Sequence, residues 1–210
     1  MTKIEYIDFI RNSLQMTDET SRFHPAQVEA AINSAVNTVF YEMYAKNPKV
    51  MAKSLERYTT IYSPIDITPS ANATTGRYES SLDVDVIDLP RKTGGVFDVI
   101  AKDQTPAVTK FVPVTPLEGD QLMGSESSLP GNVVGYSFTG PRTIEYWDMS
   151  AAEAVASVVA RLLKQFKSYS NSDNVLLPYG QDERIVELVR QYLGVIPPKD
   201  LVNDNTNVNG

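Results

Sequence analysis

Apolar side chains recur at helical spacing in both terminal parts of the chain. A stripe at three-and-four spacing predicts a short helix over residues 3–15; its members are Ile4, Ile7, Ile10 and Leu14. After a polar connector, "TDETSRFHP", Pro25 suits the first turn of a longer helix that ends near Asn47. The apolar face of this helix comprises Val28, Ala31, Ile32, Ala35, Val36, Val39, Phe40 and Met43.

The middle of the chain, from about Leu55 to Tyr146, alternates apolar and polar residues between turn residues, which is typical of strands. Six strands are predicted, with the sequences "RYTTIYSPIDI", "DVDVIDLP", "VFDVIAKD", "KFVPVTP", "VVGYSF" and "RTIEYWD". The reversal "TGP" between the last two predicts a hairpin. The stretch "LEGDQLMGSESSLPG" before the hairpin predicts one helical turn and a loop.

Two further helices are predicted after the β-rich segment. Ser150 and Glu153 form a capping-box pattern at the start of "SAAEAVASVVARLLKQFKSY", whose alanines would allow close packing against the stretch Ala30–Val36. The last helix lies in "LLPYGQDERIVELVRQYLGVIPPKD". Its apolar face is narrow and its other face carries both signs of charge. Pro197 and Pro198 predict an extended exit into a tail rich in Asn and Asp.

These elements together predict an α+β protein. Residues 1–54 and 148–196 are expected to form an antiparallel helical bundle, in which the N- and C-terminal helices pack together. Residues 55–147 are expected to form an inserted β-rich domain, and residues 197–210 an extended C-terminal tail. The final helix would close the bundle, while the tail either orders against a neighbouring molecule or is simply a loose terminus.

Composition narrows the classes of function. The 210 residues are 42% hydrophobic and 21% charged, as in an ordinary globular protein. There is no apolar run of about 18 residues and no signal-peptide pattern, so we expect a cytoplasmic, non-membrane protein. The chain has no cysteine, which excludes disulfides, thiolate ligands and a cysteine nucleophile. A formal net charge of −7 argues against a surface built to hold nucleic acid, but is compatible with a conduit through which DNA slides.

No catalytic, cofactor or metal site is expected. "GYSFTG" misses the nucleophile-elbow spacing by one residue, and "KTGGVF" lacks the residues of a phosphate loop. The single histidine, His24, precedes Pro25 and is expected to end a loop. Asp83, Asp85 and Asp88 are a possible cation site, but their alternation with apolar residues favours the solvated face of a strand.

The β-rich segment holds most of the large aromatic side chains. These are Tyr58, Tyr62, Tyr78, Tyr136, Phe138, Tyr146 and Trp147. Aromatic residues of this kind stack on bases or sugars in some proteins, yet they are also favoured in strands for packing alone. Because no arginines or lysines are interleaved with them, core or subunit-interface packing is the favoured interpretation.

The order of these parts resembles that of the head-to-tail connector proteins of tailed bacteriophages. It is similar in layout to the tail tubular protein A adaptors. In its sequence motifs the chain is most similar to the neck ring proteins of crAss-like phages. Two signals carry the resemblance: "LP" before "GVFDVIAKD" and "FVPV", and "LLPYGQDERIVELVRQYLG" before the proline-containing tail. The resemblance implies a structural subunit in a ring of twelve copies that surrounds the DNA channel in the virion neck, with the portal and other neck or tail proteins as partners. It implies no active site.

Function would then depend on surfaces. Contacts are expected on the last helix and tail, at Tyr179, Arg184, Glu187, Arg190, Tyr192, Pro197, Pro198 and Asp200. Contacts are also expected in the loop from Leu117 to Pro130, at Leu117, Leu122 and Met123, although an ordinary mobile loop is the alternative there. Two other functions remain open: a soluble ligand-binding module that uses the aromatic β segment, and an enzyme that uses a carboxylate pair such as Asp83 with Asp85.

Overall fold

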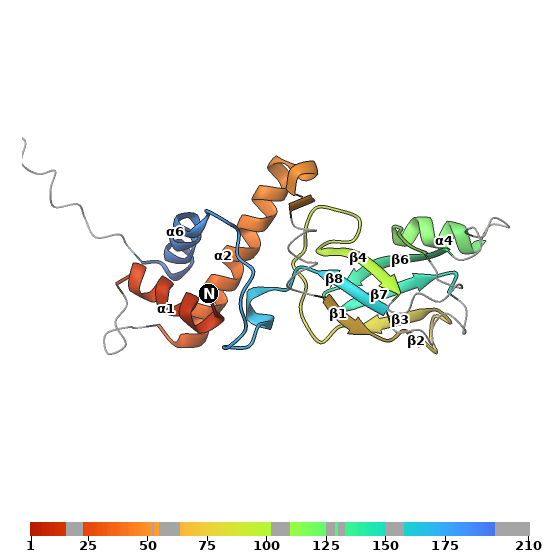
Figure 1. Ribbon diagram of the computed structural model, residues 1–210, viewed down its shortest axis with the longest axis horizontal. Helices are drawn as coiled ribbons and strands as arrows, with labels where there is room; N and C mark the ends of the chain where they lie inside the picture. Colours follow the sequence, from red (N-terminus) through yellow and green to blue (C-terminus); the bar gives the residue numbers. More distant parts are fainter. Residues whose placement is uncertain are drawn as a thin grey trace, which may run out of the picture.

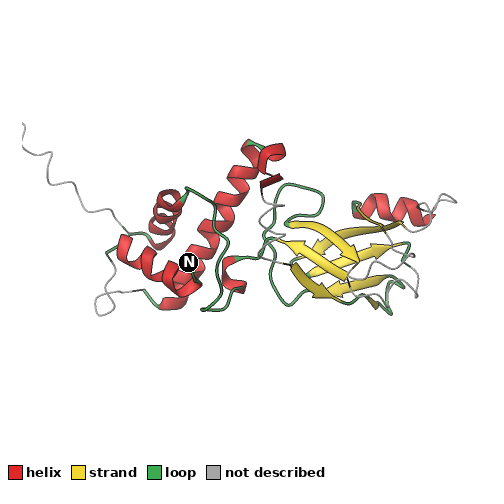
Figure 2. Ribbon diagram, viewed as in Figure 1, coloured by secondary structure: helices red, strands yellow, loops and turns green. Residues whose placement is uncertain are grey.

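The computed structural model describes residues 1–15, 23–51, 53–54, 64–101, 110–124, 129, 133–149 and 158–195. Most of the helices gather at one end of the elongated molecule, and the strands lie at the other (Figure 1, Figure 2). We refer to described residues 1–54 and 163–195 as the helical lobe and to described residues 64–162 as the β lobe. The chain is therefore an α+β protein, as predicted. Within the described part, no helix is long and apolar enough to span a bilayer.

The first helix, α1 (Lys3–Ser13), is rotated relative to the predicted stripe. Ile10 and Leu14 are buried as expected, but Ile4 is 49% exposed and Tyr6, at 1% exposed, takes its place in the core. The Lys3 side chain also faces inward, where its amine meets backbone carbonyls. The hydrophobic pattern thus identified the helix, whereas partners from the far end of the chain set the face that it buries.

The second helix, α2 (Pro25–Lys46), follows the prediction closely. Its predicted apolar face is buried except at Met43, which is partly buried, and Tyr44 joins the core. His24 caps the helix, because its Nδ1 accepts a hydrogen bond from the backbone N–H of Ala26 at 3.3 Å. The lone histidine therefore has a structural role at the end of the preceding loop, as expected.

The last helix, α6 (Asp182–Leu193), packs against α2, as does the short 3-10 helix η1 (Phe166–Ser168). Ile185, Leu188 and Val189 are buried in the core of the helical lobe, which confirms that this helix closes that core. Gly194 ends the helix with a φ of +63°, a conformation that costs glycine little.

The β lobe contains two sheets. The first has the order β1 (Pro64–Ile67), β8 (Val158–Leu162), β4 (Val96–Ala101), with both pairs antiparallel. The second has the order β2 (Ser70–Ala71), β3 (Tyr78–Ser81), β7 (Thr143–Trp147), β6 (Val133–Gly140), β5 (Lys110–Pro113). Only β5 and β6 pair in parallel among these described strands. Side chains from both sheets share one apolar core.

Strand β8 corrects the prediction of a helix over residues 150–169 and its assignment to the helical bundle. Residues 158–162 form the central strand of the first sheet, paired with β1 on one side and β4 on the other. Val158, Ala160 and Leu162 are fully buried, while Val159 and Arg161 between them are partly exposed. In so short a segment the apolar residues fit both the helical and the strand period. Pairing with two distant strands therefore decides that the segment is a strand. The capping-box residues Ser150 and Glu153 lie outside the described residues.

Some of the strands predicted in the β segment are confirmed and others are not. The strands over 96–101 and 110–113 and the hairpin of β6 with β7 are confirmed. The stretch 83–90 is not a strand; among described residues it makes only the isolated bridge from Val86 to Lys164. The pair β2 and β3 was not predicted, because polar residues dominate it. Of the first predicted strand, residues 57–63 lie outside the described part.

Two described segments, residues 85–87 and 163–165, run side by side where the two lobes meet. The backbone N–H of Ile87 donates to the carbonyl of Leu163 at 2.9 Å, and that of Gln165 donates to Asp85 at 2.8 Å. Side chains in or next to these segments enter both cores: Val86 and Leu162 pack in the β lobe, and Ile87 and Leu163 pack among the helices. The cores therefore meet through a common connection.

Candidate interaction surfaces

The polar side of α6, where partner contacts were predicted, is partly engaged within the chain. The Arg184 guanidinium donates to Glu42 of α2 at 3.2 Å and to Glu187 at 3.1 Å. The hydroxyls of Tyr192 and Thr38 lie 3.1 Å apart, so they share a second hydrogen bond between the two helices. These predicted contact residues are thus brought together by their role in attaching α6 to α2.

Some of the other predicted contact residues on α6 and the tail lie within the described part, and the rest lie outside it. Tyr192 is still 48% exposed, and Arg190 is partly buried. The predicted contacts at Pro197, Pro198 and Asp200, and the whole predicted tail 197–210, lie outside the described residues. Their roles stay predictions.

Tyr179 is the most exposed large hydrophobic side chain in the described part, at 87%. It lies in a tight turn in which the backbone N–H of Gln181 donates to the carbonyl of Pro178 at 3.2 Å. Gly180 has a φ of +70°, which glycine adopts readily at this position of a turn. Since Pro178 is buried, the turn is anchored while the tyrosine ring points away from the core.

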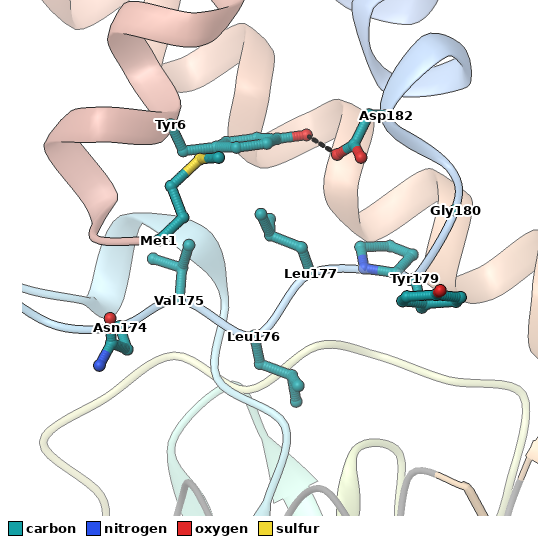
Figure 3. A pocket seen from close by; sticks show the side chains of 10 residues that line it. Met1, Tyr6, Asn174, Val175, Leu176, Leu177, Tyr179, Gly180 and Asp182 are labelled. Carbon is teal, nitrogen blue, oxygen red and sulfur yellow. Dashed lines mark hydrogen bonds between the residues drawn. The ribbon is translucent and has the colours of Figure 1, made fainter.

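Beside this turn is a pocket of about 670 Å³, shown in Figure 3. Its walls come from Met1, from Tyr6 of α1, from residues 174–180 and from Asp182 at the start of α6. Val175 and Leu177 supply partly buried apolar surface, and Tyr179 stands at its edge. The pocket therefore combines apolar walls with a single carboxylate.

Tyr6 and Asp182 meet across the pocket (Figure 3). The Tyr6 hydroxyl donates a hydrogen bond to Asp182 Oδ1 at 3.3 Å. Burial of the ring raises the pKa of Tyr6 far above its ordinary value, and the charge of Asp182 raises this pKa further. The phenol consequently remains a hydrogen-bond donor throughout the usual pH range.

The other predicted surface, at residues 117–130, begins with helix α4 (Pro116–Gly124). This helix is longer than the single turn that was expected. Leu117 on this helix is 68% exposed, so its side chain is accessible, and its contact role stays a prediction. Leu122 and Met123 belong to α4, but their side chains are not described. Residues 125–128 and 130 lie outside the described part.

Glu118 holds the start of α4. Its carboxylate accepts hydrogen bonds from the backbone N–H of Thr115 at 2.7 Å and from the Lys92 amine at 2.7 Å. The hydrogen bond from Lys92 first, and those with Thr115 next, lower the pKa of Glu118 to about 2. The Thr115 hydroxyl accepts from the Glu118 N–H in return, which completes a capping box.

α4 is also fixed against the sheet by a close approach to the sole tryptophan. A Cβ atom at Gly119 would lie 2.3 Å from Cε2 and Nε1 of Trp147, so only glycine permits this contact. On Trp147 itself lies Arg77, whose guanidinium is 5.3 Å from the ring centroid and pairs with Asp120 of α4. The exposed Leu117 is therefore presented by a firmly attached helix.

The aromatic residues of the β lobe mostly serve the core. Tyr136, Tyr146 and Trp147 are each 2% exposed or less, which confirms the packing interpretation for these three. Burial raises the pKa of Tyr146 to about 12. Tyr58 and Tyr62 lie outside the described residues.

The acidic trio does not form the solvated strand face that was predicted. Asp83 and Asp88 are exposed, but Asp85 is only 8% exposed and accepts from Arg142 Nε at 2.6 Å. Lys167 Nζ lies 2.6 Å from its other oxygen. Arg142 first and Lys167 second lower the pKa of Asp85 to about 2. Within the described part, no group of three or more His, Cys, Asp or Glu side chains is placed to hold a metal ion.

The pocket is not evident from the sequence. The two residues that face one another across it, Tyr6 and Asp182, are 176 positions apart. The one available signal was that Tyr6 lies beside the predicted stripe on α1, where an aromatic side chain at a boundary can turn either way. A scan against protein-family models gives no match to this chain, and a search of curated proteins gives none either.

Proposed function

We propose that this chain is a structural, non-catalytic subunit of an oligomeric ring in the head-to-tail connector of a tailed bacteriophage. In this proposal the helical lobe is a bundle and the β lobe an inserted domain, and the ring, of twelve copies, links the portal to another neck or tail protein. It is made in the host cytoplasm and ends in the virion, where DNA passes through the ring without sequence-specific binding.

One observation carries the proposal beyond the resemblance of sequence. Exposed apolar side chains lie on both lobes, with Tyr179 at 87% exposed on the helical lobe and Leu117 at 68% exposed on α4 of the β lobe. Figure 1 shows α4 at the end of the molecule away from the other labelled helices. A cyclic ring uses head-to-tail interfaces, and a connector also contacts different proteins above and below. Such a subunit needs several distinct contact faces, and this chain offers apolar anchors on two.

The aromatic residues of the β lobe give little support to the alternative of a ligand-binding module. Tyr136 and Trp147, the residues that would stack on a sugar or peptide, are 2% and 1% exposed. A ligand could reach these two rings only after the β lobe had opened.

The proposal is tested by locating the chain in the particle. Virions that encode it are purified and a cryo-electron map of the neck is calculated, with the expectation that the two lobes fit a ring tier in contact with the portal. Mass spectrometry of the same virions measures the copy number relative to the portal protein. Absence of the chain from purified virions, or its presence only outside the neck, would refute the proposal.

A further inference from the structure

The end of α2 and the helical residues that follow carry an exposed basic surface. Lys46, Lys49 and Lys53 are exposed there around Val50, which is 62% exposed. We term these four residues the basic tip. None of the three lysines pairs with a carboxylate of any residue that the structure describes. Figure 1 shows this end of α2 extending beyond the other helices of its lobe.

The edge of the pocket next to Tyr179 carries negative charge, opposite to the charge of the basic tip. Asp182 and Glu183 at the start of α6 are exposed, and neither makes an ion pair with a described residue. Figure 3 shows Asp182 and Tyr179 on one side of the pocket, with Leu177 between them and the wall formed by Met1 and Val175. The Asp182 carboxylate thus borders a pocket whose walls are largely aliphatic and aromatic, and Glu183 is its exposed neighbour at the start of α6.

We propose that the basic tip of one copy of this chain docks into the pocket of the next copy. Val50 would enter against Leu177 and Tyr179, while the surrounding lysines approach Asp182 and Glu183. The two surfaces lie on different elements of the helical lobe, so every copy both donates a tip and receives one. This contact rests on the proposed ring and assigns its subunit interface to these residues.

The chemistry favours this occupant over an acidic or a purely apolar one. Isolated lysines and carboxylates on separate surfaces attract over several ångströms, which aligns the copies before contact. Burial of Val50 then removes apolar area from water, and a lysine amine near the exposed ring of Tyr179 gains cation–π attraction. Association through this contact should weaken as salt concentration rises.

A disulfide trap tests the geometry, because the chain has no cysteine of its own. Ser54 is exposed beside the tip and Asn174 is exposed at the pocket, and neither is needed for the contact itself. The variants S54C and N174C are mixed and oxidised, so any 54–174 disulfide must join two molecules. We expect this product in large excess over the 54–73 product formed by S54C with A73C, a control at an exposed site of the β lobe. Equal yields would overturn the proposal.

A charge exchange tests the energetics. K49E and E183K should each weaken self-association by about tenfold, and the double variant K49E/E183K should recover most of the loss. K110E reverses an exposed lysine of the β lobe and should change nothing. Association constants are measured by sedimentation equilibrium, with circular dichroism confirming that each variant is folded. A double variant that is as weak as the singles combined would contradict the contact.

The outcomes separate this inference from the proposed function. A ring that forms equally well in all charge variants would leave the connector proposal standing and would refute this interface. A chain that stays monomeric in every variant, and yields no 54–174 disulfide, would overturn the inference, whereas the location of the chain in the virion is decided by the cryo-electron map.

Discussion

Asp85 Oδ1 accepts a hydrogen bond from Arg142 Nε at 2.6 Å. Arg142 lies in the turn of the β6–β7 hairpin, and Asp85 lies in the segment that leads into the helical lobe. The second oxygen of the same carboxylate pairs with Lys167 of η1, also at 2.6 Å. One nearly buried carboxylate therefore joins a β hairpin to the helical lobe, next to the backbone hydrogen bonds that connect the two cores.

Replacement of Asp85 by Asn should lower the free energy of unfolding by about 1 to 2 kcal/mol at pH 7. The amide keeps the shape of the side chain but cannot pair with two cations. Arg142 and Lys167 are each about half exposed, so water compensates part of the loss. Urea denaturation gives the value, and D83N, at an exposed neighbour, is the control.

The effect of Asp85 should disappear in acid. The pKa of Asp85 is lowered from 3.8 to about 2 in the folded protein, so folding favours the charged form. The stabilisation is present above about pH 4 and is lost as pH falls towards 2. The difference in stability between the wild type and D85N should shrink over that range. A difference that stays constant from pH 7 to pH 2 would rule out the ionised carboxylate as its source.

Substitution of Gly119 by Ala should disturb Trp147. The added methyl would lie 2.3 Å from the indole, so α4 or the ring must move, at a cost of about 1–3 kcal/mol despite the better helix propensity of alanine. Trp147 is the sole tryptophan, and its fluorescence should shift to the red as water reaches it.

The matched control is G140A, where the nearest atom to the new methyl is Thr143 Oγ1 at 3.9 Å. Its emission should equal that of the wild type. Identical spectra for G119A and the wild type would contradict the close contact of α4 with the ring.

The attachment of α6 should depend on its apolar face more than on its ion pairs. Leu188 is 5% exposed, and L188A should cost about 2 to 5 kcal/mol. The Arg184–Glu42 pair is 38% and 35% exposed, so water screens it and R184A should cost much less than L188A. Denaturation followed by helical circular dichroism compares the two variants, and equal losses of stability would contradict this order.

Lys3 should stabilise the helical lobe although it is a buried amine. Its Nζ lies 2.7 Å from Glu29 and donates to the carbonyl of Tyr169 at 2.8 Å. K3M fills similar space but leaves these groups unpaired, which should cost about 1–3 kcal/mol. K110M, at an exposed lysine, should be nearly neutral in the same thermal unfolding experiment. An unchanged stability of K3M would indicate that water replaces the amine.

Elements with strong local signals were predictable. α2 repeats one apolar face over six turns between a proline and a C-terminal cap, and the β6–β7 hairpin brackets an obvious reversal. Local pattern sufficed because the hydrogen bonds that define these elements close over a few residues. The exposure of Tyr179 and Leu117 could likewise be anticipated, since turn and polar residues surround them.

The sequence by itself determined the α+β class, the extents of α2 and α6 and the existence of the hairpin. Tertiary structure alone decided that residues 158–162 are a strand, because only pairing with β1 and β4 supplies hydrogen bonds to both edges. It also decided that Asp85 is buried between two cations and that Tyr6 faces Asp182 across a pocket. In each case the deciding partner lies far away along the chain, and a local pattern carries no information about a contact whose energy arises only after the chain has folded.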